Sequence, residues 1–320
     1  MIRMHRHLGL GLALVALSCG GDDSAGNQDS GGTTTVQSGI NLDGSSDDAA
    51  DSSAPKLDVG SAQTVGTNPD DQEMGCQKVD VVFSVDNSGS MQEEIAEMQG
   101  AVFDAFPDAL LAVNGGLLDF QLAVIDACNN PANFHNHGTP GDCNFANGAN
   151  YMVSSNPELA SEYACVMQLD TSGWNDQADA CSGQNDDEAP ANTAADAVSA
   201  DNKANVGFVR NDAVLLIVAM TDEDEKPVPD ASAQEIADKI IAGAGGSIDD
   251  VVFLAIAGGS DCDGPYGSAE DAAFLREVAQ IFVDADRGIF WDLCTGDIPA
   301  AFEAVVDVVD VACTEFDPVG

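Results

Sequence analysis

The stretch Val79-Asp80-Val81-Val82-Phe83-Ser84-Val85 is followed directly by Asp86-Asn87-Ser88-Gly89-Ser90. The first segment is apolar and rich in β-branched residues, which predicts a buried strand. Asn-Ser-Gly breaks this pattern, so the acid and the two hydroxyls are predicted on a loop at the carboxyl end of the strand. Open α/β sheets bind ligands at that end. One carboxylate and two hydroxyls are hard oxygen donors, which suit Mg²⁺, Mn²⁺ or Ca²⁺.

A second acid follows another predicted strand. The run Asp212-Ala-Val-Leu-Leu-Ile-Val-Ala-Met220 is apolar, and it ends in Thr221-Asp222-Glu223-Asp224. An Asp-x-Ser-x-Ser motif alone also fits an ordinary turn after a strand. Two carboxylates at the ends of neighbouring parallel strands favour a ligand site instead. With both motifs in place, the chain resembles a von Willebrand factor type A domain.

The resemblance implies a metal-ion-dependent adhesion site. In that family Asp-x-Ser-x-Ser opens the site, and here it corresponds to Asp86, Ser88 and Ser90. The acid that follows the fourth strand of the family corresponds to Asp222, and it usually acts on the metal through water. The implied cofactor is a divalent cation, Mg²⁺ or alternatively Mn²⁺ or Ca²⁺.

The family normally adds a hydroxyl ligand from the loop before its third helix. This chain departs from the family there, since Asn185-Asp-Asp-Glu-Ala-Pro190 runs into Ala191-Asn192-Thr193. Thr193 is the natural hydroxyl, while Glu188 resembles a Glu found here in some bacterial relatives. Either residue also fits an ordinary helix start, because acids and Thr stabilise first turns. The sequence leaves both open as metal ligands.

Strands and helices alternate along the rest of the chain. Strands are predicted at 79–86, 117–125, 212–220, 250–257 and 288–293, with a short edge strand near 151–153. Helices are predicted near 90–112, 190–204, 231–243, 268–283 and 297–312. The first of these helices should face the core through residues at helical spacing, namely Met91, Ile95, Met98, Val102 and Phe106. The alternation predicts an α/β fold, a doubly wound, mainly parallel sheet flanked by helices, with a disulfide-rich insertion from 127 to about 186.

The N-terminus predicts export. Residues 1–18 form a signal peptide with a basic start and the apolar run 8–17, which is too short to span a bilayer as a mature helix. The run ends in Ser18-Cys19-Gly20-Gly21, which resembles a bacterial lipoprotein site with Cys19 lipidated. Ala16 stands where such sites usually carry Leu, so plain secretion remains the alternative.

Residues 19–75 are predicted to form the lipidated Cys and a flexible acidic linker, because they carry almost no large apolar side chains. The von Willebrand factor type A-like domain then covers 76–316. The expected location is the cell envelope, lipid-anchored at the outer membrane or the cell surface, with the periplasm as an alternative. The lipid is the only membrane attachment predicted.

Cysteine number favours an oxidising compartment. Besides Cys19 the chain has eight cysteines, an even number, which indicates disulfides. In a fold whose two ends lie close together, Cys76 and Cys313 would join them. The other six are expected to pair locally, as Cys128–Cys143, Cys165–Cys181 and Cys262–Cys294, although their spacing does not fix the connectivity. A zinc site built from Cys128, Cys143, His135 and His137 is a less favoured alternative, because its spacing lacks Cys-x₂-Cys.

Charge restricts the partners. The formal net charge is −45, which repels nucleic acid and anionic lipid surfaces. Divalent ions and cationic partners are attracted, although such acidity also keeps a protein soluble in salty surroundings.

Two function classes compete with each other. In the favoured one, the metal keeps an open position for a carboxylate of a protein ligand, as in similar adhesion domains, and the chain is not an enzyme. The rival is a phosphatase-like hydrolase with a strand-end Asp, which needs a second Asp two residues later as acid/base. Ser88 occupies that position and cannot shuttle a proton in this way. A purely structural envelope protein is a third reading.

Overall fold

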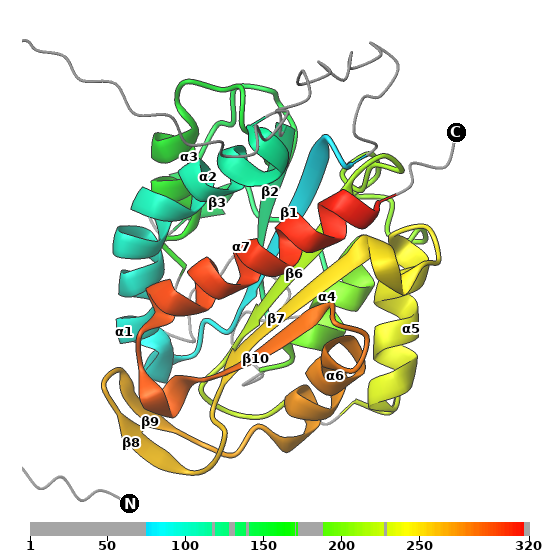
Figure 1. The fold of residues 1–320 in the computed structure, drawn as a ribbon. Coiled ribbons are helices and arrows are strands. Elements are labelled where there is room, and N and C mark those ends of the chain that lie inside the picture. The colour runs from blue at the N-terminus through cyan, green and yellow to red at the C-terminus, as the bar shows by residue number, and fades with distance from the viewer. Residues whose placement is uncertain are drawn as a thin grey trace, which may run out of the picture. The chain divides into compact units, whose positions relative to one another are not determined.

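The computed structural model describes residues 75–116, 119–127, 132–138, 141–169, 171, 188–226 and 229–316. Its centre is a six-stranded sheet in the order β10-β7-β6-β1-β2-β5 (Figure 1). The strands are β1 (Lys78–Val85), β2 (Asp119–Asp126), β5 (Met152–Val153), β6 (Val214–Met220), β7 (Val251–Ala257) and β10 (Gly288–Asp292). All neighbouring strands are parallel except β2 and β5. The order reverses at β1, as in doubly wound sheets, so the predicted fold class is confirmed.

Helices cover both faces of the sheet (Figure 1). One face carries α1 (Gln92–Glu97), α2 (Phe103–Ala112) and α7 (Ile298–Glu315). The other carries α4 (Pro190–Val198), α5 (Ala233–Gly243) and α6 (Ala273–Val283). A hydrophobic core lies on each face of the sheet, and β1 contributes to both. Val81 and Phe83 pack against the face with α1, α2 and α7, and Val82 packs against the face with α4, α5 and α6. Successive side chains of a strand point to opposite faces, which is why a strand buried on both sides reads as a continuous apolar run.

The helical region after β1 is interrupted, although one helix was expected. The turn η1 (Gly89–Met91) leads into α1, and a π-helical turn η2 (Met98–Val102) separates α1 from α2. Gly100 inside η2 has φ −100° and ψ −106°, which is not helical. The core residues predicted for this region are nevertheless all buried, namely Met91, Ile95, Met98, Val102 and Phe106.

Several short elements were not predicted. They are the hairpin strands β3 (His137–Gly138) and β4 (Gly141–Asp142), helix α3 (Leu159–Val166), the hairpin strands β8 (Cys262–Gly264) and β9 (Gly267–Ala269), and the turns η3 (Val113–Gly115), η4 (Ile248–Asp250) and η5 (Leu293–Thr295). The helix expected over 268–283 therefore begins only at Ala273. The helix expected near 190–204 ends at Val198.

Two of the predicted disulfides are confirmed. Cys76 pairs with Cys313, and the Cys76 N–H also donates to the Cys313 carbonyl at 2.7 Å. Cys262 pairs with Cys294, 32 residues later. The first bond joins the segment before β1 to the last helix, so it closes the domain.

Two predicted pairings are wrong, because Cys143 pairs with Cys165 rather than with Cys128, and Cys165 is not free for Cys181. The reason is the unpredicted helix α3, which lies against β3. Gly138 in β3 approaches Cys165 so closely that an added Cβ would lie 2.1 Å from the Cys165 carbonyl oxygen. This packing places the Cα atoms of Cys143 and Cys165 5.6 Å apart, an ordinary disulfide spacing.

The signal peptide, Cys19, the acidic linker, Cys128 and Cys181 lie outside the described residues. Within the described residues, no helix has the length and apolar character needed to cross a membrane.

Candidate metal centre

Asp86 lies at the carboxyl end of β1 and has no solvent exposure. Its Oδ1 accepts a hydrogen bond from the Ser88 backbone N–H at 2.7 Å, and its Oδ2 accepts one from the Thr221 hydroxyl at 2.8 Å. Thr221 follows β6, the neighbouring parallel strand. Both carboxylate oxygens are thereby fixed, and each keeps a further lone pair for a cation.

The two serines and Asp222 complete a connected polar group. The Ser88 and Ser90 hydroxyl oxygens lie 3.0 Å apart. The Ser90 hydroxyl also hydrogen-bonds to Asp222, whose side chain is almost fully buried. Ser90 itself is exposed and Ser88 is half-buried, so the group opens to solvent on the serine side. The structure therefore brings together four predicted ligands from two strand ends.

Several buried side-chain oxygen atoms of the described residues have no hydrogen-bond partner. Two of them are Oδ1 of Asp222 and Oγ1 of Thr193, and Oε2 of Glu94 in α1 is another. Thr193 is fully buried in the first turn of α4. A buried polar atom left without a partner costs about 1–3 kcal/mol, so such atoms call for an explanation. Oxygen ligands that await a hard cation explain the atoms of Asp222 and Thr193, and the donor set thus fits a divalent ion.

Glu188, the rival of Thr193 as a ligand, is engaged with Lys226. The two residues form an antiparallel bridge, with Glu188 N to Lys226 O at 2.7 Å and Lys226 N to Glu188 O at 2.9 Å. The Lys226 ammonium lies 3.4 Å from Glu188 Oε2 and also pairs with Glu223. Because a cation already faces its carboxylate, the geometry favours Thr193 over Glu188 as the ligand from this loop.

The loop after β6 does more than carry Asp222, which the sequence did not reveal. Asp224 accepts hydrogen bonds from Phe274 N at 2.9 Å and Leu275 N at 3.1 Å, in the first turn of α6. Glu225 accepts from Ala191 N at 2.6 Å, in the first turn of α4. Asp222, Asp224 and Glu225 of this loop thus face the candidate site, α6 and α4, respectively. The only sequence signal was the density of acids itself.

Burial disfavours the charged carboxylates of this region. It raises the pKa of Asp86 to about 6, against hydrogen bonds from Ser88 and Thr221 that lower it. Burial also raises the pKa of Asp222. Glu94 in α1 is buried, and burial, with added repulsion from Asp222 and Asp86, raises its pKa to about 8. A divalent cation would offset this shared cost, because an opposite charge favours the ionised form.

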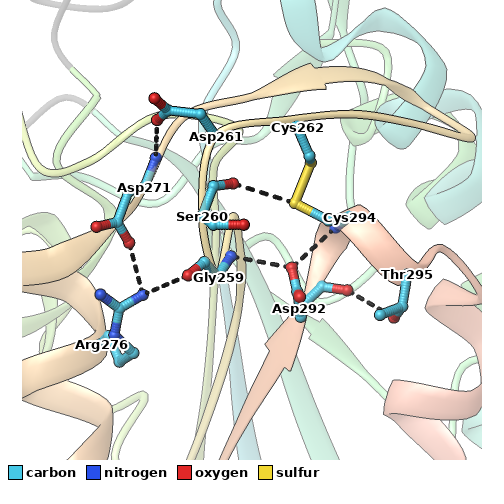
Figure 2. The surroundings of a disulfide bond; sticks show 9 residues. All are labelled: Gly259, Ser260, Asp261, Cys262, Asp271, Arg276, Asp292, Cys294 and Thr295. Atoms are coloured by element: carbon cyan, nitrogen blue, oxygen red, sulfur yellow. Dashed lines mark hydrogen bonds and ion pairs between the residues drawn. A yellow bond between two sulfur atoms is a disulfide. The ribbon is translucent and has the colours of Figure 1, made fainter.

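A disulfide-clipped hairpin supports the Asp222 loop. Strands β8 and β9 pair antiparallel, and the Cys262–Cys294 bond joins them to η5. Figure 2 shows how Asp292 accepts a hydrogen bond from the Cys294 N–H, at 3.0 Å, next to this bond. Directly after β9, Glu270 N donates to the Asp222 carbonyl at 2.8 Å. The hairpin is thereby tied to the backbone of a candidate ligand.

The zinc alternative is wrong, because Cys143 is consumed by its disulfide with Cys165. The His135 and His137 rings stack on each other, with centroids 4.8 Å apart, and His135 Nε2 lies 3.6 Å from Asp126 Oδ2. Among the described residues, no group of three or more His, Cys, Asp or Glu side chains is arranged to hold a metal ion. The candidate centre at Asp86 is of another kind, since hydroxyls supply most of its donors.

No protein-family model and no curated protein matches the chain. Solved structures that are similar to it include proximal thread matrix protein 1 from the mussel byssus, with 14% identity and a TM-score of 0.39. A von Willebrand factor type A structure from Catenulispora acidiphila has 15% identity and a TM-score of 0.40. The pilus adhesin SpaC from Lactobacillus rhamnosus GG, in its open conformation, has 11% identity and a TM-score of 0.37.

These alignments cover 73%, 74% and 74% of this chain, but only 48%, 42% and 30% of the three other chains. The chain thus spans less than half of each. At such identities the similarity concerns the fold alone. The doubly wound sheet that the sequence predicted is observed, with the two predicted acidic motifs directly after β1 and β6.

Proposed function

We propose that this chain is an exported, lipid-anchored binding or adhesion module that holds a protein partner through a divalent cation. The ligands would be Asp86, Ser88, Ser90, Thr193 and Asp222, with Glu188 beside them as the partner of Lys226. The cation would be Mg²⁺, or alternatively Mn²⁺ or Ca²⁺. The partner would offer a carboxylate, and nucleic acid would be repelled by the net charge of −45.

The observation that carries this proposal is that two buried oxygen atoms of candidate ligands, Asp222 Oδ1 and Thr193 Oγ1, have no hydrogen-bond partner. They come from two different segments that converge on the end of β1. The first turn of α4 is tied to β1 by the Ser84 hydroxyl, which donates to the Pro190 carbonyl at 2.8 Å. Asp222 is linked to the Asp86 loop through Ser90.

The residues of the site would act by binding and orientation alone. A bound cation supplies a positive charge with an open coordination position for an anionic oxygen. Asp86 would hold its charge toward the ion because Thr221 and Ser88 fix its two oxygens. Ser90, the exposed member, marks the side from which a partner would approach.

We propose no catalytic step for this site. A phosphatase-like mechanism needs an acid/base two residues after the strand-end Asp, where Ser88 stands, hydrogen-bonded to Ser90. We expect neither the wild type nor Ser88→Asp to hydrolyse a generic phosphate ester. The added carboxylate should instead weaken metal-dependent partner binding by repelling the partner's carboxylate. Robust metal-dependent turnover by the wild type would overturn the assignment.

Isothermal titration of the secreted chain with Mg²⁺, Mn²⁺ and Ca²⁺ tests the proposal directly. Thr193→Ala should weaken ion binding, whereas Thr193→Ser keeps the hydroxyl and should bind nearly as the wild type does. The matched pair separates a lost ligand from a disturbed helix start. If the wild type binds none of the three ions, the metal-dependent function is wrong.

A further inference from the structure

We infer that Glu225 is a positioning residue for the ion site, which holds the first turn of α4 so that Thr193 is presented to the ion opposite Asp222. This inference rests on the proposed function and adds a residue that is not itself a ligand. The loop after β6 would then have two roles, since Asp222 would bind the ion and Glu225 would position the helix turn that carries Thr193.

The contacts of Glu225 link two segments that are far apart in sequence. Its Oε1 accepts from Ala191 N at 2.6 Å and its Oε2 accepts from Asn192 N at 3.4 Å. Both N–H groups belong to the turn that ends in Thr193. Glu225 also lies three residues after Asp222 on the same loop. A single side chain therefore bridges two proposed ligand segments.

Helix α4 does not cap itself. Its N-cap residue, Ala189, provides no side-chain hydrogen bond, and Pro190 occupies the first turn. Most helices satisfy their first N–H groups with a local Ser, Thr, Asn or Asp. Here the acceptor comes from the β6 loop, so hydrogen bonds join the start of α4 to that loop.

The placement of Glu225 has an energetic cost that a surface cap would avoid. Glu225 has no exposure, and no ion pair of the described residues includes it. Burial raises its pKa to about 8, although the two N–H donors of α4 act in the opposite direction. A buried carboxyl group without a cation is unfavourable. A role in arranging the neighbouring ligands explains why the cap is placed there.

Two further contacts reinforce the same junction. The backbone bridge between Glu188 and Lys226 joins the segment before α4 to the loop after β6. The Ser84 hydroxyl joins Pro190 to β1. With these contacts fixing the backbone, Glu225 is the only side chain of the described β6 loop, 221–226, that hydrogen-bonds to α4 itself.

The same loop provides a matched control. Asp224, the preceding residue, caps α6 through Phe274 N and Leu275 N, and α6 also lacks a side-chain cap of its own. Helix α6 carries none of the proposed ligands. Asp224→Ala therefore removes a cap of the same kind from the same loop, and with it the acceptor of Glu225 N at 2.9 Å, but it removes no contact to the segment that bears Thr193.

The test is titration of the full chain with Mg²⁺ and Mn²⁺, together with thermal unfolding in a chelator. Glu225→Ala should weaken ion binding about tenfold or more, as expected when a partner that orients a metal ligand is lost. Glu225→Gln keeps an acceptor for Ala191 N and should restore most of the affinity. Asp224→Ala should lower the unfolding temperature but leave the affinity close to that of the wild type.

A double-mutant cycle shows whether Glu225 acts through Thr193. If it does, Thr193→Ala should cost little further affinity in a Glu225→Ala background, because coupled sites are not additive. Additive losses would overturn the inference, as would wild-type affinity in folded Glu225→Ala or an equal loss in Asp224→Ala. If Glu225→Ala does not fold, failure of Glu225→Gln to keep the affinity decides against it. Absence of ion binding in the wild type would overturn the proposed function as well. That result differs from the outcomes above, in which the wild type binds the ion and only the role of Glu225 fails.

Discussion

The Thr221 hydroxyl donates to Asp86 Oδ2 at 2.8 Å, with both groups completely buried. This bond joins the carboxyl ends of β1 and β6, which are neighbouring parallel strands. Thr221 precedes Asp222 in sequence, so the contact also fixes the start of the loop that carries the second acid. The candidate site thus lies on loops that are anchored at the ends of the two central strands.

Replacing Asp86 with Asn should abolish ion binding while the fold survives. The amide keeps the size of the side chain and an acceptor for Ser88 N, but it lacks the charge that a divalent ion requires. At an ion concentration about 100 times the dissociation constant, binding should stabilise the wild type by about 2.7 kcal/mol. Urea unfolding with and without ion should show that gain in the wild type and none in Asp86→Asn. An unchanged affinity would remove the metal site altogether.

Removing the Cys262–Cys294 bond should weaken ion binding as well as stability. That bond anchors the hairpin whose following residue, Glu270, donates to the Asp222 carbonyl. The Cys143–Cys165 bond closes a loop of comparable length but lies in the insertion, so Ser substitution of that pair is the control. Both double variants should lose stability, and only the first should lose affinity. Equal affinities in titrations of the two variants would contradict this coupling.

Substituting both Cys76 and Cys313 with Ser should destabilise the domain more than either of the other two pairs. The sequence separations are 237, 22 and 32 residues for this pair, Cys143–Cys165 and Cys262–Cys294. In the chain-entropy account, stabilisation grows with loop length, from about 3 kcal/mol for a short loop to roughly 5 kcal/mol for a long one. Denaturant unfolding of the three double variants checks the order, and a smaller loss for the long loop would refute it.

Stability without ion should fall as pH rises toward 8. Glu225 has a folded-state pKa of about 8, raised from 4.5 by burial. Between pH 4.5 and about 8 the folded state keeps this proton while the unfolded state releases it. The contribution of Glu225 to the free energy of unfolding is therefore complete below about pH 4.5 and is lost as pH rises through about 8. Unfolding in a chelator across this interval measures the slope. Glu225→Gln should flatten it, and an unchanged slope in that variant would show that other groups are responsible.

Lipid anchoring rests on Cys19, which follows a basic start and a short apolar run. Cys19→Ser should release the protein from the membrane fraction, because the substitution removes the thiol that would carry the lipid. Fractionation of cells that express either form, followed by detection of the folded domain, is the measurement. Wild-type levels of the variant in the membrane fraction would point to some other attachment.

The central strands and their strand-end motifs were predictable because their signal is local. Val79–Val85 and the run ending at Met220 are continuously apolar, and both become buried parallel strands followed by the predicted acids. The Cys143–Cys165 bond was not predictable, since it depends on how α3 packs against β3. The role of Glu225 was equally hidden. Its carboxylate differs from its acidic neighbours only through the tertiary position of α4, which no sequence pattern records.

The clip between Cys76 and Cys313 has a mechanical consequence for a tethered module. Tension applied through the N-terminal tether would enter the domain at Cys76, while a partner held at Asp86 would pull from the other end of β1. Strand β1 has parallel neighbours on both sides, β2 and β6, so its hydrogen bonds would be loaded in shear and together rather than peeled one by one. The Cys76–Cys313 disulfide would transmit part of that load to α7. The rest of the force would reach the binding site along β1, which is hydrogen-bonded on both sides.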